Sequence, residues 1–364
     1  MSKLKVGIIG CGAIAKNKHM PALMKKKDQV EVIAFCNRDR KKAEQIAKAF
    51  HIKEAQVYSD YHSLLANKDI DVVHICTPNL YHSPITVAAL QAGKHVMCEK
   101  PMAINALEAA EMVQAAKESG KKLTIAFQNR FREDALLLKQ SCETGELGDI
   151  YAAKAHAVRR RGVPTWGVFM DKELQGGGPL IDIGTHALDL TLWCMNNYEV
   201  HSVTASTFHE LKQQNLTNPF GPWEPETFHV EDSAFAFIRM KNGAIIYLET
   251  AWALNTLDER EAMTTLFGTK GGAEMQRTSC GTHNELILNG EKHKHLYETR
   301  FQHAADIDFN QAETNTVADR ELSQWINAII EDTSPLVTPH QSLVVAQLVD
   351  AIYKSAETGE TIYL

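Results

Sequence analysis

The feature that most constrains the fold is a glycine-rich turn directly after a short apolar run. The run Val6–Ile9 has the length of a buried strand, and Gly10–Ala15 reads Gly-Cys-Gly-Ala-Ile-Ala. In a dinucleotide-binding βαβ unit, the first glycine permits a tight bend, the second lets the backbone approach a pyrophosphate, and the third small residue permits close helix packing. The turn therefore predicts such a unit. Its expected cofactor-binding residues are Gly10, Gly12, Ala13 and Ile14.

Over the first third of the chain, short apolar runs alternate with helical stretches. In the helical stretches apolar residues recur at helical spacing, as in Ala43, Ile46, Ala47 and Phe50. This alternation is typical of a parallel sheet built from βαβ units and disfavours an isolated strand-to-helix turn. The expected strands, apolar because helices cover both faces of the sheet, are Val6–Ile9, Val30–Cys36, Val72–Cys76, Val96–Cys98 and Leu123–Phe127.

Beyond about residue 148 the pattern changes to strands joined by turns. Ser233–Arg239 and Ala244–Thr250 flank an Asn-Gly turn, and Glu285–Leu288 precedes Asn289-Gly290. Asn-Gly between two such runs is the strongest short hairpin signal. We therefore expect a mainly antiparallel open sheet with helices in this part of the chain.

The length of 364 residues favours about two domains. We expect an α/β chain with an N-terminal Rossmann dinucleotide-binding domain over 1–127 and an α+β substrate and oligomerisation domain over 128–340. A C-terminal helix and tail over 341–364 could pack back on the first domain. The helix is indicated by one apolar stripe: Val345, Leu348, Val349 and Ile352.

The residues after the second expected strand bear on the choice of cofactor. An acid about 20 residues beyond the glycine turn binds the ribose 2′-hydroxyl of NAD, whereas an arginine nearby accommodates the 2′-phosphate of NADP. The expected position is Asn37, which is not an acid, and Arg38 and Asp39 follow it. Arg38 favours NADP, but Asp39 leaves NAD open if the turn shifts by a residue or two.

Charge and hydropathy exclude several classes of partner. The net charge of −7 and pI near 6.1 provide no basic field for a polyanion such as nucleic acid. The apolar run near residue 6 is too short for a secretion signal or a membrane span. We expect a cytoplasmic chain with neither nucleic acid nor membrane as partner.

The cysteines and histidines indicate neither a disulfide framework nor a metal centre. The seven cysteines are an odd number without paired spacing, which favours reduced, mostly buried thiols. Alternate histidines such as His293 and His295 are more often a solvated strand face than metal ligands, so no metal site is expected. The cysteines are Cys11, Cys36, Cys76, Cys98, Cys142, Cys194 and Cys280.

Four further segments resemble the Gfo/Idh/MocA family, named after glucose-fructose oxidoreductase, inositol dehydrogenase and rhizopine catabolism. The most specific, Gly93–Pro101, resembles the family's strand ending in Glu-Lys-Pro, and Gly176–His186 resembles the helix that supplies its catalytic groups. Thr77–His82 resembles the turn after the fourth strand, and Gly268–Gly272 a loop of the second domain. The resemblance spans nearly the whole chain and implies a cis bond before Pro101.

This resemblance implies a dinucleotide site that extends well beyond the glycine turn. The segment at Gln128 resembles the family's crossing into the second domain. Together with the turn after the second strand, the resemblance predicts these additional cofactor-binding residues: Asn37, Arg38, Thr77, Pro78, Asn79, His82, Glu99, Lys100 and Gln128.

The residues themselves also support a reaction site. Asp182 and His186 are four apart and share a helix face, with Asp189 three further along, among apolar neighbours. A polar face on an otherwise buried helix needs partners or a ligand. Lys100 ends a buried strand at the carboxyl edge of the sheet, where open α/β folds bind ligands. The expected catalytic residues are Lys100, Asp182 and His186.

These groups suit the oxidation of a secondary alcohol to a ketone by NAD or NADP. His186 would serve as general base, Lys100 would stabilise charge on the reacting oxygen, and Asp182 would orient one of them. The resemblance implies a sugar, cyclitol or related polyol as substrate. Arginines and a tryptophan on the loop 159–166 either clamp that substrate or form an ordinary basic surface. The expected substrate-binding residues are Lys100, Arg160, Trp166, Asp182 and His186.

Two rival functions follow from the same resemblance. One branch of the family contains glycosidases that hold NAD and cleave sugars by transient oxidation and elimination. Other members are non-enzymatic dinucleotide-sensing regulators, which would not need Lys100 and His186. The resemblance also implies a homodimer or homotetramer formed through the exposed face of the C-terminal sheet.

Overall fold

The structure is a computed structural model that describes residues 2–214, 217–277, 284–301 and 316–364. The chain forms two compact units, each made of two stretches. The first unit comprises Met1–Gln128 and Asn315–Ala346, and the second comprises Asn129–Thr314 and Gln347–Leu364. This division differs from the expected boundary at residue 340, because a late stretch of chain makes its contacts within the first unit.

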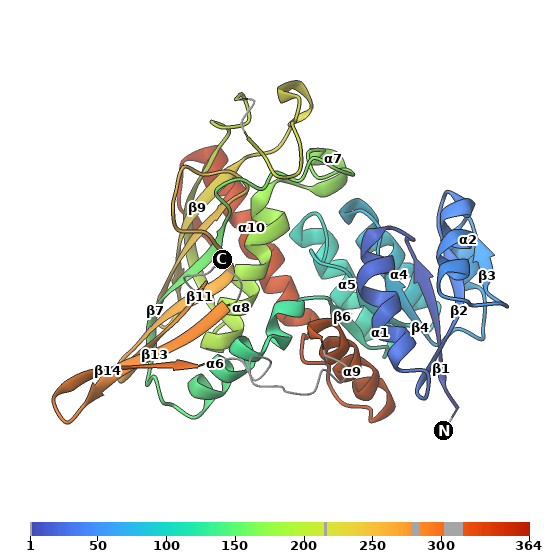
Figure 1. Cartoon of the computed structure of the whole chain (residues 1–364), viewed down its shortest axis with the longest axis horizontal. Helices are drawn as coiled ribbons and strands as arrows, with labels where there is room; N and C mark the ends of the chain where they lie inside the picture. Colours follow the sequence, from blue (N-terminus) through green and yellow to red (C-terminus); the bar gives the residue numbers. More distant parts are fainter. Residues whose placement is uncertain (1, 215–216, 278–283, 302–315) are drawn as a thin grey trace. The chain divides into compact units, whose positions relative to one another are not determined.

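The first unit contains a six-stranded parallel sheet in the order β3-β2-β1-β4-β5-β6 (Figure 1). All five expected strands are present; Val30–Cys36 has its expected ends, and the other four differ by one or two residues. The short strand β3, whose residues are only partly buried, was not expected. The strands are β1 (Leu4–Ile9), β2 (Val30–Cys36), β3 (Gln56–Tyr58), β4 (Val72–Ile75), β5 (His95–Cys98) and β6 (Leu123–Ile125).

Helices cover this sheet and complete an apolar core. Helix α9 (Val317–Ile330) contributes Leu322, Trp325 and Ile326 to the same buried cluster as Val6 and Ile8 of β1. It lies beside α1, so the late stretch of chain is an integral part of this unit (Figure 1). The other helical segments are η1 (Ala15–His19), α1 (Met20–Lys25), α2 (Arg40–Ala49), α3 (Tyr61–Leu65), η2 (Asn79–Tyr81), α4 (His82–Gln91) and α5 (Ala106–Ser119).

The second unit contains a nine-stranded sheet in the order β14-β13-β12-β11-β7-β10-β9-β8-β15 within the described chain. The pairing is antiparallel except between β7 and β10, which are parallel. The mainly antiparallel sheet is therefore confirmed. The strands are β7 (Ile150–Val158), β8 (Val200–Phe208), β9 (Ser233–Met240), β10 (Ile245–Ala251), β11 (Arg260–Gly268), β12 (Gly271–Arg277), β13 (Asn284–Lys292), β14 (His295–Phe301) and β15 (Ile362–Tyr363).

The two expected Asn-Gly turns have different outcomes. The turn at Asn242-Gly243 joins β9 and β10 as expected. The turn expected at Asn289-Gly290 is wrong, because both residues lie inside β13 and the chain turns at His293 and Lys294. The reason is packing: a Cβ on Gly290 would meet the Tyr297 ring at about 3.0 Å, so the glycine admits a cross-strand aromatic.

One face of this sheet is covered by helix α8 (Thr185–Met195), which packs on β7 and β11 (Figure 1). Every residue of α8 from Thr185 to Cys194 is buried. The remaining helical segments are α6 (Glu133–Glu143), α7 (Lys172–Gln175), η4 (Leu180–Gly184) and η5 (Pro225–Thr227). Helix η3 (Gln128–Phe131) begins in the first unit, and α10 (Pro339–Thr358) carries the expected apolar stripe, whose four residues are buried.

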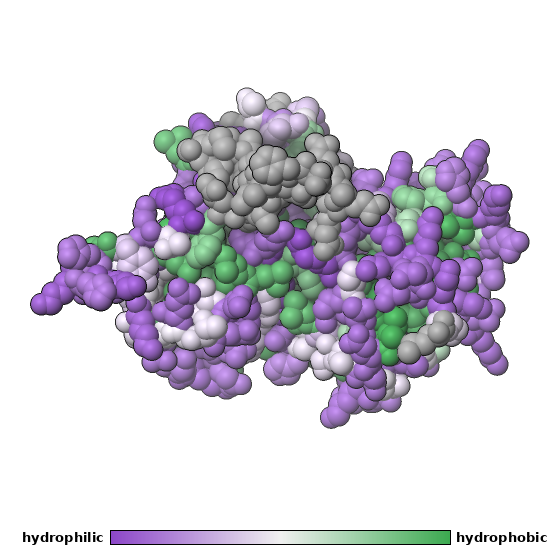
Figure 2. Space-filling view, turned by 60° about the horizontal axis from the view of Figure 1, so that its bottom comes forward, coloured by the Kyte–Doolittle hydropathy of each residue, from purple (hydrophilic) through white to green (hydrophobic). Residues whose placement is uncertain are grey.

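The surface and the cysteines add two observations. The face in Figure 2 is mainly hydrophilic with interrupted hydrophobic patches, and no described helix is long and apolar enough to cross a membrane. The six described cysteines are free thiols, all buried except Cys142, which is partly buried. Cys280 lies outside the described residues.

Candidate active site

In the first unit, the expected cofactor residues lie at one edge of the sheet. They follow the carboxyl ends of β1, β2, β4, β5 and β6, and these strands are parallel neighbours. This is the edge at which open α/β sheets bind their ligands. The structure therefore brings the expected cofactor residues of this unit to a common edge.

The glycine turn has the local geometry that a pyrophosphate needs. Gly10 has φ +93°, and a Cβ there would lie 2.5 Å from the carbonyl oxygen of Cys76, so no other residue fits. A Cβ on Gly12 would meet nothing within 4 Å. The backbone at Gly12 is thus open to a ligand, while Ala15 is buried against the core. Since the turn leads into a helix with unpaired N–H groups, these residues fit a dinucleotide phosphate.

The segment after β2 is organised around Asn37. Its side-chain oxygen accepts the N–H of Cys11 at 3.1 Å, which ties it to the glycine turn. The Arg38 guanidinium lies over the Tyr81 ring at 5.3 Å. The Asp39 carboxylate caps helix α2 by accepting the N–H of Lys41. One oxygen of the Asp39 carboxylate therefore has a structural role, as the N-terminal cap of α2.

The turn after β4 is held by His82 rather than left open around it. His82 is fully buried, with Nε2 at 2.9 Å from the carbonyl oxygen of Thr77 and Nδ1 at 2.7 Å from that of Pro101. Burial lowers the pKa of His82. The His82 ring therefore connects the turns after β4 and β5 and positions both through their backbone carbonyl groups. Pro78 and Asn79 follow Thr77 in the turn after β4.

Glu99, at the end of β5, belongs to a buried network of charged groups. Its Oε1 accepts hydrogen bonds from Lys18 Nζ at 2.9 Å and from His19 Nε2 at 2.9 Å. Lys18 also pairs with Glu321 of helix α9 at 3.0 Å. Burial alone would raise the pKa of Glu99, but Lys18 and His19 hold it well below its ordinary value. The carboxylate is therefore charged and engaged by the protein.

The network extends across the sheet to His74 of β4. His74 Nδ1 lies 2.9 Å from His19 Nδ1, and burial, reinforced by His19 and Lys18, lowers the pKa of His74 well below its usual range. His74 Nε2 has no partner in the described part of the chain. The arrangement that satisfies the cluster has His74 Nδ1–H donating to His19, and His19 Nε2–H donating to Glu99.

Lys100 follows Glu99 directly and is partly buried. Its backbone N–H donates to Glu99 Oε2 at 3.3 Å, so the charged network reaches the main chain of the expected catalytic lysine. The peptide bond between Lys100 and Pro101 is cis, as the resemblance implied. Gln128 begins η3 just beyond β6.

In the second unit, Asp182 and His186 lie in one continuous helix, but its first part is not a regular α-helix. The segment η4 is a π-helical turn, and α8 begins at Thr185. Single π turns inside helices occur frequently at functional sites. The Thr185 hydroxyl donates to the carbonyl oxygen of Ile181 at 3.0 Å within this turn.

The glycines before η4 permit a close approach of buried polar groups. A Cβ on Gly177 would lie 1.9 Å from the Tyr353 hydroxyl, and one on Gly178 would lie 2.3 Å from the carbonyl oxygen of Glu231. The Glu231 carboxylate accepts the N–H groups of Gly178 and Leu180 and the Tyr353 hydroxyl at 2.9–3.1 Å. Glu231, two residues before β9, thus caps the N-terminus of the helix that carries Asp182, where a negative charge is favourable.

Asp182 is held by the indole of Trp252. Trp252 is fully buried, and its Nε1–H donates to Asp182 Oδ2 at 2.9 Å. Arg159 forms a two-point ion pair with Glu261 at 2.6 Å. Burial opposes the charge on Arg159, but Glu261 and, at longer range, Asp182 raise its pKa. The carboxylate of Asp182 is therefore oriented by the neutral indole N–H of Trp252 and interacts at longer range with the positive charge of Arg159.

Asp189, on the face expected to be polar, has a structural partner. Its carboxylate accepts two hydrogen bonds from Arg130, at 2.9 Å and 2.6 Å, and both side chains are fully buried. This pair joins η3 to α8 inside the second unit. We therefore separate Asp189 from the expected reaction site.

The loop 159–166 places its residues unequally. Arg160 is exposed and its backbone N–H donates to Glu259 at 2.7 Å. Arg161 donates to Asn255 Oδ1 at 2.7 Å. Trp166 is exposed and packs edge-on against Phe169 and Phe220. Arg159, rather than Arg160, is the arginine that acts on Asp182.

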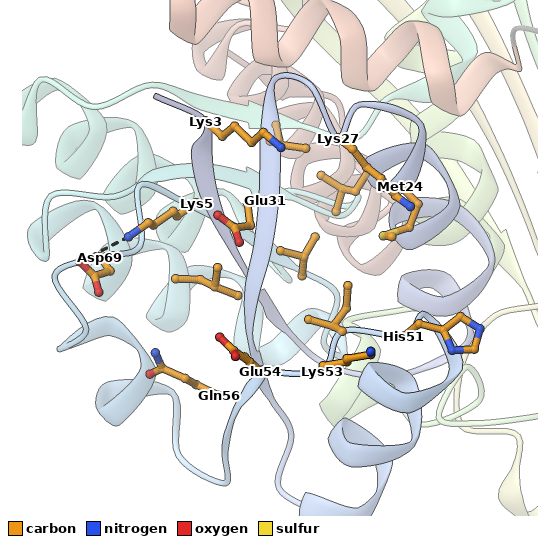
Figure 3. Close-up of a pocket in the computed structure, with 15 residues that line it drawn as sticks. Lys3, Lys5, Met24, Lys27, Glu31, His51, Lys53, Glu54, Gln56 and Asp69 are labelled. Carbon is orange, nitrogen blue, oxygen red and sulfur yellow. Dashed lines mark ion pairs between the residues drawn. The ribbon is translucent and has the colours of Figure 1, made fainter. Parts of the chain in front are cut away.

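Two other features do not compete as sites. Within the described ranges, no group of three or more His, Cys, Asp or Glu side chains is placed to hold a metal ion. A hollow of about 820 Å³ lies at the amino ends of β1, β2 and β3 (Figure 3). Lys and Glu side chains line it in a mixture, and Lys5 pairs with Asp69. It lies at the edge opposite to that used for ligands in such sheets.

Several residues of these networks were not anticipated from sequence. Lys18 and His19 precede a proline-containing apolar helix and resemble ordinary surface residues of its first turn. Glu231, Trp252 and Glu321 lie far along the chain from the groups they hold. No local pattern indicates such partners, because only the tertiary fold creates the contact.

Comparisons with known proteins cover both parts of the chain. Residues 4–127 match a family model described as "Oxidoreductase family, NAD-binding Rossmann fold", and residues 139–364 match its "C-terminal alpha/beta domain". The chain is 38% identical over its whole length to 98% of D-glucoside 3-dehydrogenase of Escherichia coli K12. It is 26% identical over 98% of its length to 96% of inositol 2-dehydrogenase of Salmonella typhimurium LT2.

Solved structures give the same fold. Levoglucosan dehydrogenase in complex with NADH superposes with a TM-score of 0.83 at 24% identity, covering 100% of this chain and 99% of the other. The family models match both domains, and the first is described as NAD-binding. This chain therefore belongs to the Gfo/Idh/MocA oxidoreductases, a family with an NAD-binding Rossmann domain whose members include sugar and polyol dehydrogenases.

Proposed function

We propose that the chain is an NAD(P)-dependent dehydrogenase that interconverts a secondary alcohol and a ketone on a sugar, cyclitol or related polyol. The observation that carries this proposal is the Asp182–Trp252 hydrogen bond at a π turn, one helical turn before His186. It gives a fixed carboxylate four residues before an imidazole on a helix that is otherwise buried.

The residues divide the chemistry among them. The glycine turn at Gly10 and Gly12 would hold the dinucleotide, which would supply the hydride acceptor for the substrate carbon. His186 takes the proton from the hydroxyl group, since an imidazole exchanges protons near neutral pH. Lys100 donates a hydrogen bond to the reacting oxygen and stabilises the charge that develops there. Asp182 orients His186, and in the reverse direction His186 returns the proton.

A pyranoside is the substrate we favour. The similarity to D-glucoside 3-dehydrogenase extends over the whole chain at 38% identity, above that to inositol 2-dehydrogenase at 26%. We therefore propose a ring hydroxyl group of a D-glucoside as the position oxidised, with free polyols and cyclitols as poorer substrates.

For the cofactor we propose a preference for NADP. Arg38 lies over Tyr81, where a guanidinium suits a 2′-phosphate, while the Asp39 carboxylate caps α2. Exchange of Arg38 for Ala should raise the KM for NADP about ten- to hundredfold and leave the KM for NAD within about twofold, since one charge-assisted contact to phosphate is worth about 1.5–3 kcal/mol. Equal changes for both cofactors would contradict this preference.

The decisive experiment follows absorbance at 340 nm with NAD or NADP and a panel of methyl glucosides, 1,5-anhydroglucitol, levoglucosan and inositols. Stoichiometric NAD(P)H and keto-sugar formation supports the proposal. Release of methanol from a methyl glucoside without net NADH would instead identify a glycosidase that oxidises transiently. Binding of NAD(P)H without turnover of any sugar would favour a sensor.

We also propose that the chain forms a homodimer or homotetramer through the open face of the second unit's sheet, in the cytoplasm. Exposed aromatic residues gather on neighbouring strands there, with Phe237 of β9 directly opposite Tyr247 of β10. Large exposed apolar patches mark association sites, and free thiols suit a reducing compartment. Light scattering of Phe237→Asp should show a smaller species than the native chain.

A further inference from the structure

An exposed aromatic pair stands on two loops of the second unit. Trp166 is 51% exposed and Phe220 is 46% exposed, although both are large apolar side chains. Their ring centroids are 4.7 Å apart at 81°, so the edge of one ring meets the face of the other. This geometry leaves part of each ring's face open to a ligand.

The pair is held in place by hydrogen bonds rather than by burial. Asn218 Oδ1 accepts the N–H of Val163 at 3.0 Å, while Asn218 Nδ2 donates to the carbonyl oxygens of Val163 at 2.9 Å and Gly221 at 2.8 Å. The Thr165 hydroxyl also donates to the carbonyl oxygen of Phe220. One amide thus fixes both loops. Exposed rings that are ordered in advance lose little entropy when they bind a ligand.

Ring contacts connect this pair to the candidate catalytic carboxylate. Phe169 meets Trp166 edge-on at 5.7 Å and meets Trp252 edge-on at 6.5 Å. Trp252 donates to Asp182 at 2.9 Å. Two aromatic rings, those of Phe169 and Trp252, therefore connect Trp166 to Asp182.

Two of the three arginines on this loop are engaged by the protein. The Arg159 guanidinium is paired with Glu261, and Arg161 donates to Asn255 and to the carbonyl oxygens of Arg160 and Leu254. Besides the exposed Arg160, the two loops offer an aromatic surface. Such surfaces bind the C–H face of a neutral sugar ring or another ring of similar size.

We propose that Trp166 and Phe220 form a second subsite that binds the substituent of a glycoside, namely the second sugar ring or aromatic aglycone attached to the ring that is oxidised. This inference rests on the proposed function, because it takes Asp182 as the position of the reacting ring. It makes the chain selective for glycosides with a ring-shaped substituent over methyl glycosides. Asn218 is a positioning residue for the subsite.

The test compares kcat/KM for two substrates that share the oxidised ring, methyl β-D-glucoside and phenyl β-D-glucoside, with cellobiose as a third. Trp166→Ala and Phe220→Ala should each lower kcat/KM for the two larger glycosides about three- to tenfold, mainly through KM, since aromatic pairs contribute about 0.5–1.5 kcal/mol. Methyl glucoside should change less than about twofold. Trp166→Tyr should restore most of the selectivity, and Asn218→Ala should lose it.

Tyr363→Ala is the matched control, because Tyr363 is also an exposed aromatic of the second unit but lies on β15 at the sheet edge. It should leave all three substrates unchanged. Equal losses for methyl and phenyl glucoside in Trp166→Ala and Phe220→Ala, or no loss for the larger glycosides, would overturn the subsite.

Calorimetric binding of cellobiose in the presence of NADPH separates this inference from the proposed function. If the native chain oxidises none of the sugars, the proposed reaction fails, and binding still decides the subsite. Weaker binding of cellobiose, but not of methyl glucoside, by Trp166→Ala supports the aromatic pair. Equal binding by the native chain and the variant removes it.

Discussion

Two helices of this chain begin with a π turn, but the carboxylates near the two turns have different partners: an ammonium group near one and neutral hydrogen-bond donors near the other. Both η1 in the first unit and η4 in the second are π turns that follow a glycine-rich segment. Around η1, the carboxylates of Glu99 and Glu321 face the ammonium group of Lys18. Around η4, Glu231 and Asp182 accept hydrogen bonds from neutral donors.

The difference indicates what each region does. In the first region two buried carboxylates depend on one buried ammonium group, and removal of that cation leaves buried negative charge without compensation. A carboxylate held by a neutral N–H group, as Asp182 is by Trp252, receives a hydrogen bond but no compensating charge from that donor. We therefore expect stability to depend on the first region, and turnover on the second.

The largest effect should come from His186→Ala. Turnover should fall by roughly two to four orders of magnitude, which is the usual contribution of a positioned acid–base group. The Kd for NADPH and the melting temperature should change little, because His186 is not part of the charged network of Lys18, Glu99 and Glu321 in the first unit. Stopped-flow turnover and fluorescence titration of NADPH measure the two. Near-normal turnover would remove His186 from the mechanism.

Lys18→Met tests the other side of the comparison. The substitution leaves two buried carboxylates without their cation and should lower the free energy of unfolding by about 3–5 kcal/mol, measured by urea titration. Glu321→Gln added to it should recover part of the loss.

Lys25→Met is the matched control, because Lys25 also joins the first helix to α9 through Asp319, at 2.7 Å, but is 44% exposed. It should cost less than about 1 kcal/mol. Similar losses for Lys18→Met and Lys25→Met would show that the buried network has no special weight.

Trp252→Phe tests the neutral donors with the ring retained. Loss of the indole N–H to Asp182 should lower kcat by about ten- to hundredfold, since a hydrogen bond to a charged group contributes about 1.5–3 kcal/mol. Trp325→Phe is the same change in the first unit, at an indole whose Nε1 has no partner among the described residues. It should leave kcat unchanged. If both variants behave alike in steady-state assays, the Trp252 hydrogen bond is not functional.

The smallest effect concerns pH. Burial keeps His74 neutral in the folded chain, with its pKa well below 6.5. Below pH 6.5 the unfolded chain binds a proton there that the folded chain does not, so stability is fully present above that pH and falls as pH decreases, by at most about 1.4 kcal/mol per pH unit.

His74→Asn should flatten the dependence of the unfolding free energy on pH between 7 and 5.5, whereas replacement of the exposed His62 by Asn should not. A slope unchanged by His74→Asn would show that other groups cause the acid sensitivity.

Sequence reasoning recovered the parts of this molecule that local patterns determine. Buried parallel strands are continuous apolar runs, so Val30–Cys36 was predicted with its observed ends. The glycine turn was found because its glycines lie within three residues of each other: Gly10 allows the tight bend, and Gly12 leaves the backbone open to a ligand. Gly290 shows the limit, since its small size serves a neighbouring strand's Tyr297 rather than a turn.

For the candidate site, sequence supplied the groups but not what holds them. The roles of Lys100, Asp182 and His186 stay predictions. Their surroundings depend on contacts between distant residues, such as Glu321 with Lys18 and Trp252 with Asp182. Periodicity left partners or a ligand open for the polar helix face, and only the structure shows that Asp189 has a buried partner, Arg130.

The division of the chain into interleaved units has a consequence for its synthesis. The first unit's core contains Trp325 of α9, and the second unit's helix cap contains Tyr353 of α10. Domains generally fold as they emerge from the ribosome, the N-terminal one first. Here the Rossmann sheet emerges more than 180 residues before α9, so both units wait for the last 50 residues, and neither can be isolated by cutting the chain once.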